Sequence, residues 1–310
     1  MKYLIILNPG SKGGKSQKSF EKILDFFKDN QINFDYRITA SLQNAYEISY
    51  AENKNYDVIV AVGGDGTINK VINGFFDIEG KRHSNNAIGI IYTGTSPDFC
   101  KSYNIPLNIE DAINNIIKPQ IKQIKIGRIE FRENNINDGT KTAYFACCAN
   151  IGLGSKLATY ANNGIRKILG DFGGTLVSLI GTLLSYRKKD YRLVVDGETY
   201  IYNNVHNISV GITPYIASGI KVHGNIEEMK TQFYILIVKE LKLSNVLSVL
   251  RAIYTGKIVD NNNFSLLYCK EIEIYDLDKV SEVEFDGDHQ GYLECKIEIN
   301  KDGLDVIVGE

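Results

Sequence analysis

The chain has 310 residues, of which 44% are hydrophobic and 23% are charged, and its formal net charge is −2. This composition is typical of a folded protein with enough apolar residues for two packed domains. Because basic and acidic residues are interspersed, we expect no nucleic-acid partner and no broadly basic membrane-binding surface.

The five cysteines fall mostly in apolar runs without the paired spacing of a metal site, so we expect reduced thiols in the core. Cys147 and Cys148, in the run KTAYFACCAN, would point to opposite faces of a single strand. The N-terminal apolar run is too short for a secretory signal, which predicts a cytoplasmic protein.

Residues 172–186 are the most membrane-like segment, but they fall short of the ~20 apolar residues that a span requires. We therefore expect no transmembrane segment. A buried core helix explains this stretch, while the basic residues 187–189 that follow leave open a helix that touches a membrane interface. Arg166, Lys167 and residues 187–189 are either contacts for anionic head groups or solvated charges.

The first third of the chain alternates between two patterns. Short apolar runs predict strands at 2–7, 57–62 and 87–92, and apolar residues at alternate positions predict a strand at 34–38. Apolar residues at helical spacing predict helices near 20–27, 42–46, 68–76 and 109–117. Alternating strands and helices are typical of a doubly wound parallel sheet, so we assign residues 1–123 to an α/β domain.

From about residue 125 the chain is a succession of strand-like runs, many of them joined by short polar turns. This pattern predicts an antiparallel, sandwich-like β domain at residues 124–310. Two helical segments, near 172–186 and 242–254, interrupt it. We leave open that the extreme C-terminus packs back onto the first domain.

The stretch VAVGGDGTIN, residues 60–69, joins a buried strand to a helix. Gly63, Gly64 and Gly66 allow the backbone to approach an anion closely at the positive end of a helix, and phosphate fits best. A carboxylate there would repel phosphate unless a divalent cation lay between them, so Asp65 predicts Mg²⁺, held directly or through water. The alternative is a plain strand-to-helix turn in which Asp65 is a favourable charge near the helix start.

The segment PGSKGGKS, residues 9–16, is similar to a phosphate-binding P-loop. It departs from that motif at its first position, where Pro9 stands in place of glycine and offers neither an N–H group nor a free φ angle. We therefore expect a second phosphate-side loop, to which Asn8, Lys12 and Lys15 contribute donors and charge, with a true P-loop as the alternative.

Four motifs then occur in a recognisable order: NPGSKGGK after the first strand, GGDGTIN after the third, GTSPDFCK after the fourth and EVEFDGD late in the β domain. In this order the chain resembles the diacylglycerol kinase catalytic family, including the bacterial soluble lipid kinases, over nearly its whole length. The sphingosine kinases, NAD kinases and phosphofructokinases are relatives that share GGDGT. The resemblance implies an ATP-binding α/β domain, a β domain with the lipid-side acid, and a lipid substrate at a membrane surface, for which the inner membrane face is expected.

The resemblance also implies roles for individual residues. Those that would contact ATP or its Mg²⁺ are Asn8, Pro9, Lys15, Thr39, Gly63, Gly64, Asp65, Gly66, Thr67, Gly94, Thr95 and Asp98. Asp65 would be the metal ligand. Asp286 would be the base that accepts the hydroxyl proton, and Asp288 an accessory acid near the phosphates.

The sequence departs from the family pattern at three places. Pro97 precedes Asp98 where the family usually has Asn, so an amide contact on the nucleotide side is missing. Asp288 stands where Glu is commoner. Residues 227–231, EEMKT, replace an Asp-Gly turn that helps bind a structural metal in some bacterial members, which removes the basis for that site here.

Asp-Gly pairs begin at positions 65, 138, 196, 286 and 302, and this pair is favoured in tight hairpin turns. Asp196 lies between two predicted strands with a two-residue connection, so we interpret it as a plain hairpin, although it begins the Asp-Gly-Glu pattern of the family's catalytic acid. Asp286 also ends a strand, but we expect no direct second strand after it. Its setting and late position select Asp286 as the base.

The prediction is thus an ATP-dependent kinase that transfers the γ-phosphate to a lipid hydroxyl such as that of diacylglycerol, using Mg²⁺. The alternatives are an NAD kinase or another small-molecule kinase of the superfamily, and a nucleotide-binding relative with weak or no catalysis. The identity of the lipid and the formation of a homodimer are left open.

Overall fold

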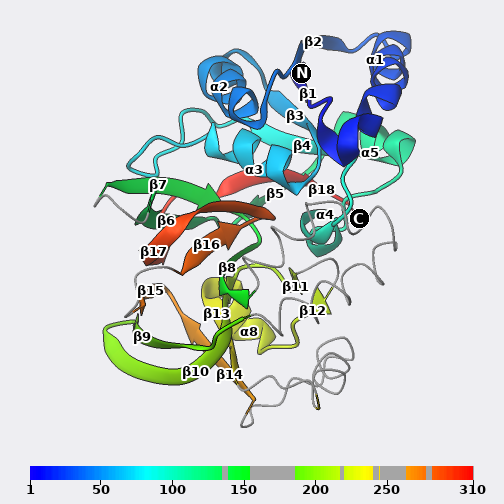
Figure 1. The fold of residues 1–310 in the computed structure, drawn as a ribbon. Coiled ribbons are helices and arrows are strands. Elements are labelled where there is room, and N and C mark those ends of the chain that lie inside the picture. Colours follow the sequence, from blue (N-terminus) through cyan, green and yellow to red (C-terminus); the bar gives the residue numbers. More distant parts are fainter. Residues whose placement is uncertain are drawn as a thin grey trace.

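The computed structural model describes residues 1–134, 139–153, 186–216, 220–239, 244, 263–276 and 281–309. Its first layer is a six-stranded sheet in the order β2-β1-β3-β4-β18-β5 (Figure 1). The four strands from the first part of the chain are β1 (Lys2–Leu7), β2 (Asn33–Ile38), β3 (Val58–Gly63) and β4 (Ala87–Tyr92). They run parallel to one another, as the alternating strand and helix patterns predict.

Helices cover both faces of this sheet. They are α1 (Phe20–Asp29), α2 (Leu42–Glu52), α3 (Asp65–Asn73), α4 (Asp98–Ser102) and α5 (Ile109–Ile117), with short 3-10 turns η1 (Ser11–Ser19) and η2 (Asn53–Asn55). Buried residues of α2 and α3 share one apolar cluster with the sheet, and buried residues of α1 and α5 share another. Strands β3 and β4 are buried along their whole length because side chains on both of their faces meet helices.

The second sheet is antiparallel. Its strands are β6 (Gly127–Arg132), β7 (Thr140–Phe145), β8 (Cys148–Gly152), β9 (Lys189–Val195), β10 (Glu198–Gly211), β13 (Phe233–Lys239), β14 (Phe264–Cys269), β15 (Glu271–Asp276), β16 (Glu282–Phe285) and β17 (Asp288–Ile299). Because β9 pairs with both β15 and β10, the path β10-β8-β16-β17-β15-β9 closes on itself as a barrel (Figure 1). A separate apolar cluster fills it. The predicted fold class, an α/β domain followed by an antiparallel β domain, is confirmed, and these pairings close part of the second sheet into a barrel.

The end of the chain returns to the first sheet. Strand β18 (Leu304–Val308) lies between β4, to which it runs parallel, and β5 (Gln120–Ile124), to which it runs antiparallel. The pattern analysis missed β5, because four of its five residues are exposed and the polar sequence QIKQI shows no apolar run. The boundary between residues 123 and 124 stays a prediction.

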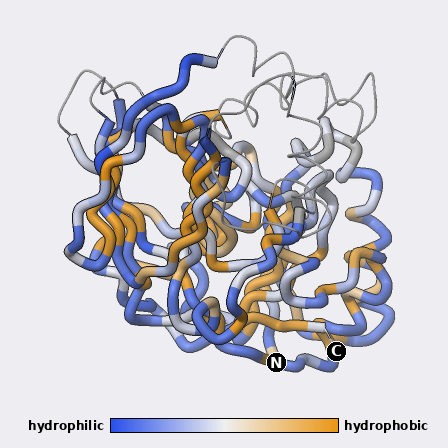
Figure 2. Tube along the Cα trace, turned by 90° about the horizontal axis from the view of Figure 1, so that it is seen from below, coloured by the Kyte–Doolittle hydropathy of each residue, from blue (hydrophilic) through white to orange (hydrophobic). Residues whose placement is uncertain are grey.

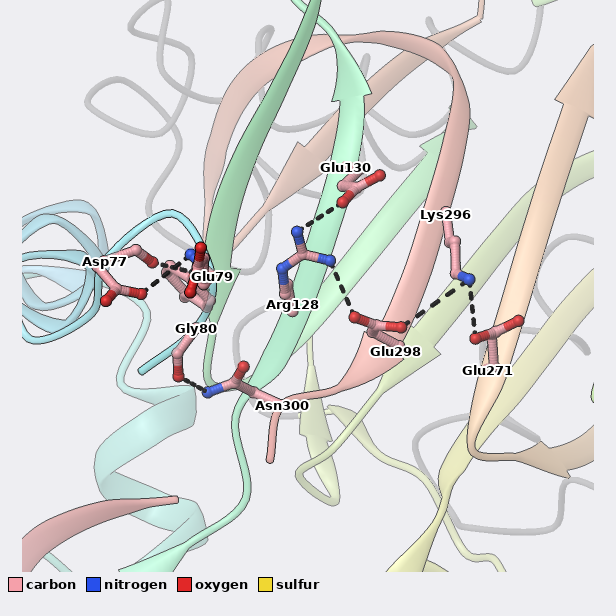
Figure 3. Close-up of polar contacts among 10 residues, drawn as sticks. Asp77, Glu79, Gly80, Arg128, Glu130, Glu271, Lys296, Glu298 and Asn300 are labelled. Atoms are coloured by element: carbon pink, nitrogen blue, oxygen red, sulfur yellow. Dashed lines mark hydrogen bonds and ion pairs between the residues drawn. The ribbon is translucent and has the colours of Figure 1, made fainter. Parts of the chain in front are cut away.

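Polar contacts hold β6 to β17, and the end of β17 to the first domain (Figure 3). Arg128 on β6 donates to Glu298 on β17 at 2.9 Å. Just beyond β17, Asn300 donates to the backbone oxygen of Gly80, in the loop between α3 and β4, at 2.8 Å. Asn300 is 7% exposed, so this bond is shielded from water and ties the loop to the point where the chain turns back toward β18.

The remaining described elements are the strands β11 (Tyr215–Ile216) and β12 (Ile220–Lys221) and the helix α8 (Ile226–Thr231). The helices expected near 172–186 and 242–254 lie outside the described residues, apart from Tyr186 and residue 244. All five cysteines are free and buried, as predicted. Hydrophobic residues line the interior of both domains and hydrophilic ones the connecting loops (Figure 2). Within the part of the chain that the structure describes, no helix combines the length and apolar character of a membrane span.

Candidate active site

The glycine-rich turn between β3 and α3 is as short as a strand-to-helix connection can be, with Gly64 alone between them. A Cβ on Gly63 would lie 2.3 Å from the hydroxyl of Thr67, so only glycine fits there. A Cβ on Gly64 would lie 3.3 Å from the Cα of Gly94, in the loop after β4. The glycine-rich turn and the loop after β4 therefore touch through their backbones.

Gly94 is equally constrained from its own side. A Cβ at this position would lie 2.7 Å from the Cα of Gly64 and 2.6 Å from the hydroxyl of Tyr92. Thr95, the next residue, is exposed, and Asp98 begins the short helix α4. The glycines at positions 64 and 94 thus allow a close approach of two backbones, and Thr95 is left as an accessible side chain at the same edge of the sheet.

Asn8 and Thr67, both predicted to contact nucleotide, bond to each other. The amide of Asn8 donates to the hydroxyl of Thr67 at 2.7 Å, and its oxygen accepts from the backbone of Gly10 at 2.9 Å. The two side chains are 8% and 2% exposed, so they fix the end of β1 against the first turn of α3. A direct contact between either one and nucleotide stays a prediction, as it does for Pro9 and for Thr39, which is 3% exposed.

The segment after Pro9 forms the 3-10 turn η1. Ser16, which would place its hydroxyl on the metal in a P-loop, is instead 2% exposed and donates to the backbone oxygen of Asn8 at 2.9 Å. This geometry favours a flanking loop over a true P-loop. The side chains of Lys12 and Lys15 lie outside the described part of the structure.

Asp65 starts α3 and faces the second domain. Its Oδ2 accepts from the hydroxyl of Tyr92 at 2.8 Å, whereas its Oδ1 is buried and has no hydrogen-bond partner among the described residues. Burial raises the pKa of Asp65 well above its ordinary value, and the charges of Asp98 and Asp286 add to that shift. The three carboxyl groups therefore share one electrostatic environment.

Asp286 is held by four donors. Its Oδ2 accepts from the amide of Asn69 at 3.0 Å and from the backbone of Ala146 at 2.9 Å, and its Oδ1 from the backbones of Cys147 at 2.9 Å and Cys148 at 3.3 Å. Burial raises the pKa of Asp286, while these hydrogen bonds oppose the shift because they favour the charged form.

The three backbone donors explain an error in the strand assignment. We expected KTAYFACCAN to be one strand, but β7 ends at Phe145 and β8 begins at Cys148, with a bend at residues 146–147. Successive N–H groups of a continuous strand point in alternating directions, so three of them could not converge on one carboxylate. The bend places Cys147 outside the strand that Cys148 begins, and it directs the three N–H groups at the Asp286 carboxylate.

The setting expected for Asp286 was also wrong. β17 begins directly at Asp288, and Phe285 pairs with Asp288, so Asp286 and Gly287 form a two-residue hairpin turn. Asp196 and Gly197 form the hairpin predicted for them. The two turns are alike, and the distinction that we expected from the following sequence does not exist. The side chain of Asp288 lies outside the described part of the structure.

Three residues near these acids were missed by the sequence reasoning. Asn69 lies four residues after Asp65, on the same face of α3, and helical spacing could have identified it. Glu284, 4% exposed, accepts from the backbone of Gly287 at 2.6 Å and from Asn150 at 2.7 Å, and so supports the turn of Asp286. Tyr92 is the last residue of β4, where an aromatic residue reads as part of the core.

The site brings α3 and the Asp286 turn into contact. A Cβ on Gly287 would lie 3.9 Å from the Cβ of Asp65, and Asn69 spans from α3 to the Asp286 carboxylate. The described residues contain no cluster of three or more Asp, Glu, His or Cys side chains that could hold a metal ion on their own. The buried Oδ1 of Asp65 is nevertheless a suitable ligand for a divalent cation whose other ligands are phosphate and water.

The sequence is also similar to known proteins. The family model described as "Diacylglycerol kinase catalytic domain" matches residues 2–129, and the one described as "YegS C-terminal NAD kinase beta sandwich-like domain" matches residues 151–308. A diacylglycerol kinase of Bacillus subtilis (strain 168) is 22% identical over 291 residues, which are 93% of this chain and 90% of the relative.

Two solved structures are similar to this one. A crystal structure of a diacylglycerol kinase from Bacillus anthracis str. Sterne has a TM-score of 0.70 at 20% identity and covers 99% of this chain and 97% of that chain. Yeast NADH kinase in complex with NADH has a TM-score of 0.59 at 12% identity, and the match covers 100% of this chain and 84% of that chain. At these identities the structures show a shared fold. Because the second family model alone spans about half of the chain, the chain belongs to the family in which a diacylglycerol kinase catalytic domain is joined to a YegS-type C-terminal β domain.

Proposed function

We propose that this protein is an ATP-dependent lipid kinase that transfers the γ-phosphate to a lipid hydroxyl such as that of diacylglycerol. The observation that carries the proposal is the contact between Asp65, at the start of α3, and the turn that carries Asp286, with Asn69 of the same helix donating to the Asp286 carboxylate. Phosphoryl transfer to an alcohol requires a phosphate-binding site with a carboxylate base beside it.

The backbone of residues 63–67 would hold the phosphates, because the glycines leave N–H groups accessible at a helix N-terminus. The exposed Thr95 and the loop that carries it would close over the same phosphates. Mg²⁺, when bound, would neutralise phosphate charge, and Asp65 offers its buried Oδ1 as one ligand.

Asp286 would accept the proton of the substrate hydroxyl. Its four hydrogen bonds use the four acceptor positions of a carboxylate, so the hydroxyl reaches it only where one donor yields. The longest bond, 3.3 Å from the backbone of Cys148, is to Oδ1, which makes Oδ1 the more accessible oxygen. Burial raises the pKa of this carboxyl group, which favours proton uptake.

The proposal includes a substrate met at a membrane surface. Among the basic residues expected to contact head groups, Arg187 and Lys188 are exposed, whereas Lys189 forms an ion pair with the buried Asp276 at 2.9 Å and is used within the fold. Arg166 and Lys167 lie outside the described residues. Work at the inner membrane face remains part of the proposal.

The test is a phosphorylation assay with purified protein, labelled ATP and Mg²⁺ against diacylglycerol, phosphatidylglycerol, sphingosine, undecaprenol and NAD. We expect label transfer to one of the lipids and none to NAD.

Asp65→Asn should remove the Mg²⁺-dependent binding of ATP while the fold stays intact, as judged by calorimetry and circular dichroism. Transfer to NAD alone would establish the NAD kinase alternative, and an Asp65→Asn protein with unchanged affinity and rate would contradict the metal role.

A further inference from the structure

We propose that Tyr92 is a positioning residue that fixes the orientation of the Asp65 carboxylate, an inference that depends on the function proposed above. Tyr92 ends β4 and pairs with Gly63 at the end of β3, which places it beside the glycine-rich turn. It is 8% exposed, and its hydroxyl donates to the Oδ2 of Asp65 at 2.8 Å.

A second bond determines the direction of the first. The backbone N–H of Ser96 donates to the Tyr92 hydroxyl at 2.7 Å. A hydroxyl has one proton, and its oxygen already accepts from Ser96, so that proton is directed at Asp65.

The consequence for Asp65 is that its two oxygens differ. Oδ2 is held by Tyr92, and Oδ1 is buried without a hydrogen-bond partner among the described residues. A rotation of the carboxyl group would break the bond to Tyr92, so the free oxygen is kept in one direction. This is the arrangement expected of a ligand whose remaining partner is a cation.

The Tyr92 hydroxyl lies between the glycine-rich turn and the loop after β4, which supports this role. It donates to Asp65 of the turn and accepts from the backbone of Ser96 in the loop, and a Cβ on Gly94 would lie 2.6 Å from it. The ring itself packs in the apolar cluster under α3. Removal of the hydroxyl alone would therefore remove the bonds to Asp65 and to Ser96 and leave the packing of the ring in place.

The experiment uses Tyr92→Phe, with Tyr56→Phe as the matched control. Tyr56 donates to the Oδ2 of Asp35 at 2.9 Å, a bond of the same kind located at the start of β3, the other end of the strand from the glycine-rich turn. Binding of ADP to each full-length protein is measured by calorimetry as free Mg²⁺ is varied, well below the melting temperature of each variant. Asp65→Asn provides the reference for loss of the ligand.

We expect Tyr92→Phe to raise the half-saturating Mg²⁺ concentration about tenfold, as the loss of one hydrogen bond to a charged group implies, and to leave ADP affinity without Mg²⁺ unchanged. Tyr56→Phe should match the wild type. If Asp65→Asn abolishes the Mg²⁺ dependence but Tyr92→Phe behaves as wild type, the positioning role is wrong. If the wild-type protein shows no Mg²⁺-dependent binding, or Asp65→Asn retains it, the proposed function fails and the role of Tyr92 fails with it.

Discussion

The turns at Asp196-Gly197 and Asp286-Gly287 are two copies of one local structure. In the first, the φ angles are 47° and 89°, and in the second they are 50° and 94°, the pair of positive values that a type I′ turn requires. In both turns the aspartate side chain accepts hydrogen bonds from the backbone N–H groups of another segment: Lys270 and Glu271 for Asp196, and residues 146–148 for Asp286.

The surroundings of the two turns differ. Asp196 is exposed, and within the described part of the chain its carboxylate accepts only from backbone, at the junction of β14 and β15. Asp286 lies against α3, receives a side-chain bond from Asn69, and has a raised pKa because of burial. A hairpin aspartate can thus be entirely structural, and only its neighbours from a distant element point to a chemical role.

The sharpest test of this comparison is the pair Asp286→Asn and Asp196→Asn. We expect Asp286→Asn to lower kcat by at least ~100-fold, the lower end of what general base catalysis contributes, with ATP affinity nearly unchanged. Asp196→Asn should leave kcat within a few fold, since its contacts are remote from α3. Steady-state kinetics with the lipid identified in the substrate panel provide the measurement.

Stability must be measured alongside the rate. Two of the four donors on Asp286 face each oxygen, so the amide nitrogen of an asparagine would leave two N–H groups without an acceptor, at about 1–3 kcal/mol for each buried group. Asp196 can hold both of its donors with Oδ1 alone. Denaturant unfolding separates the two effects, and an Asp286→Asn protein that is folded and fully active would refute the assignment of the base.

Much of the fold could be predicted from the sequence because its signals are local. The continuous apolar runs of β3 and β4 and the helical spacing in α3 and α5 reflect burial that each element carries in its own residues. The exposed strand β5 and the closure of the barrel between β9 and β10 depend on partners elsewhere in the chain, and no local pattern indicates them.

The parts of the site that depend on local sequence could also be predicted. The glycines at 63 and 64 indicate that another group approaches the backbone closely, and the acid beside them suggests a cation. By contrast, Asn69 bonds to an acid 217 residues away, and the bend at 146–147 makes sense only once Asp286 is in place. Tertiary contacts of this kind leave no periodicity to detect, which is why the two hairpins could not be told apart by their flanking residues.

Asn69 distinguishes the two turns, because among the described residues Asp196 accepts from no side-chain donor. Asn69→Ala removes one of four bonds to Asp286 together with a bond to the backbone oxygen of Tyr144 at 2.9 Å, and we expect kcat to fall about tenfold, near the ~1.4 kcal/mol of one contact to Asp286. Asn53→Ala is the control, since the buried Asn53 donates to the backbone oxygen of Gly74, at the far end of α3, at 2.8 Å rather than to Asn69 or Asp286. It should lower stability with little effect on kcat, and equal losses of kcat in both variants would argue against a specific role for Asn69.

Asp65 begins a third Asp-Gly pair, in which one carboxylate oxygen has no hydrogen-bond donor among the residues that the structure describes. Because its pKa is raised in the folded protein, protonation of Asp65 favours folding at low pH, and this contribution is lost as the pH rises through the folded pKa. Asp65→Asn, which does not titrate, should therefore raise the melting temperature of the nucleotide-free protein at neutral pH. The difference should shrink as the pH approaches about 4, the ordinary pKa of aspartate. A melting temperature that is lowered at neutral pH would contradict the buried charge.

The smallest expected effect separates backbone strain from contact with the site. Gly197→Ala and Gly287→Ala both place a side chain at a positive φ angle, 89° and 94°, and each should cost roughly 1–2 kcal/mol of stability. Around Gly197 nothing lies within 4 Å of the new Cβ, whereas at Gly287 the Cβ of Asp65 lies at 3.9 Å, an ordinary contact distance. We therefore expect equal losses in denaturant unfolding and a change in kcat of a few fold for Gly287→Ala alone, because its methyl group stands between the two acids. A loss of activity in Gly197→Ala of the same size would mean that hairpin strain anywhere in the barrel reaches the site, and the two turns would then differ less than their surroundings imply.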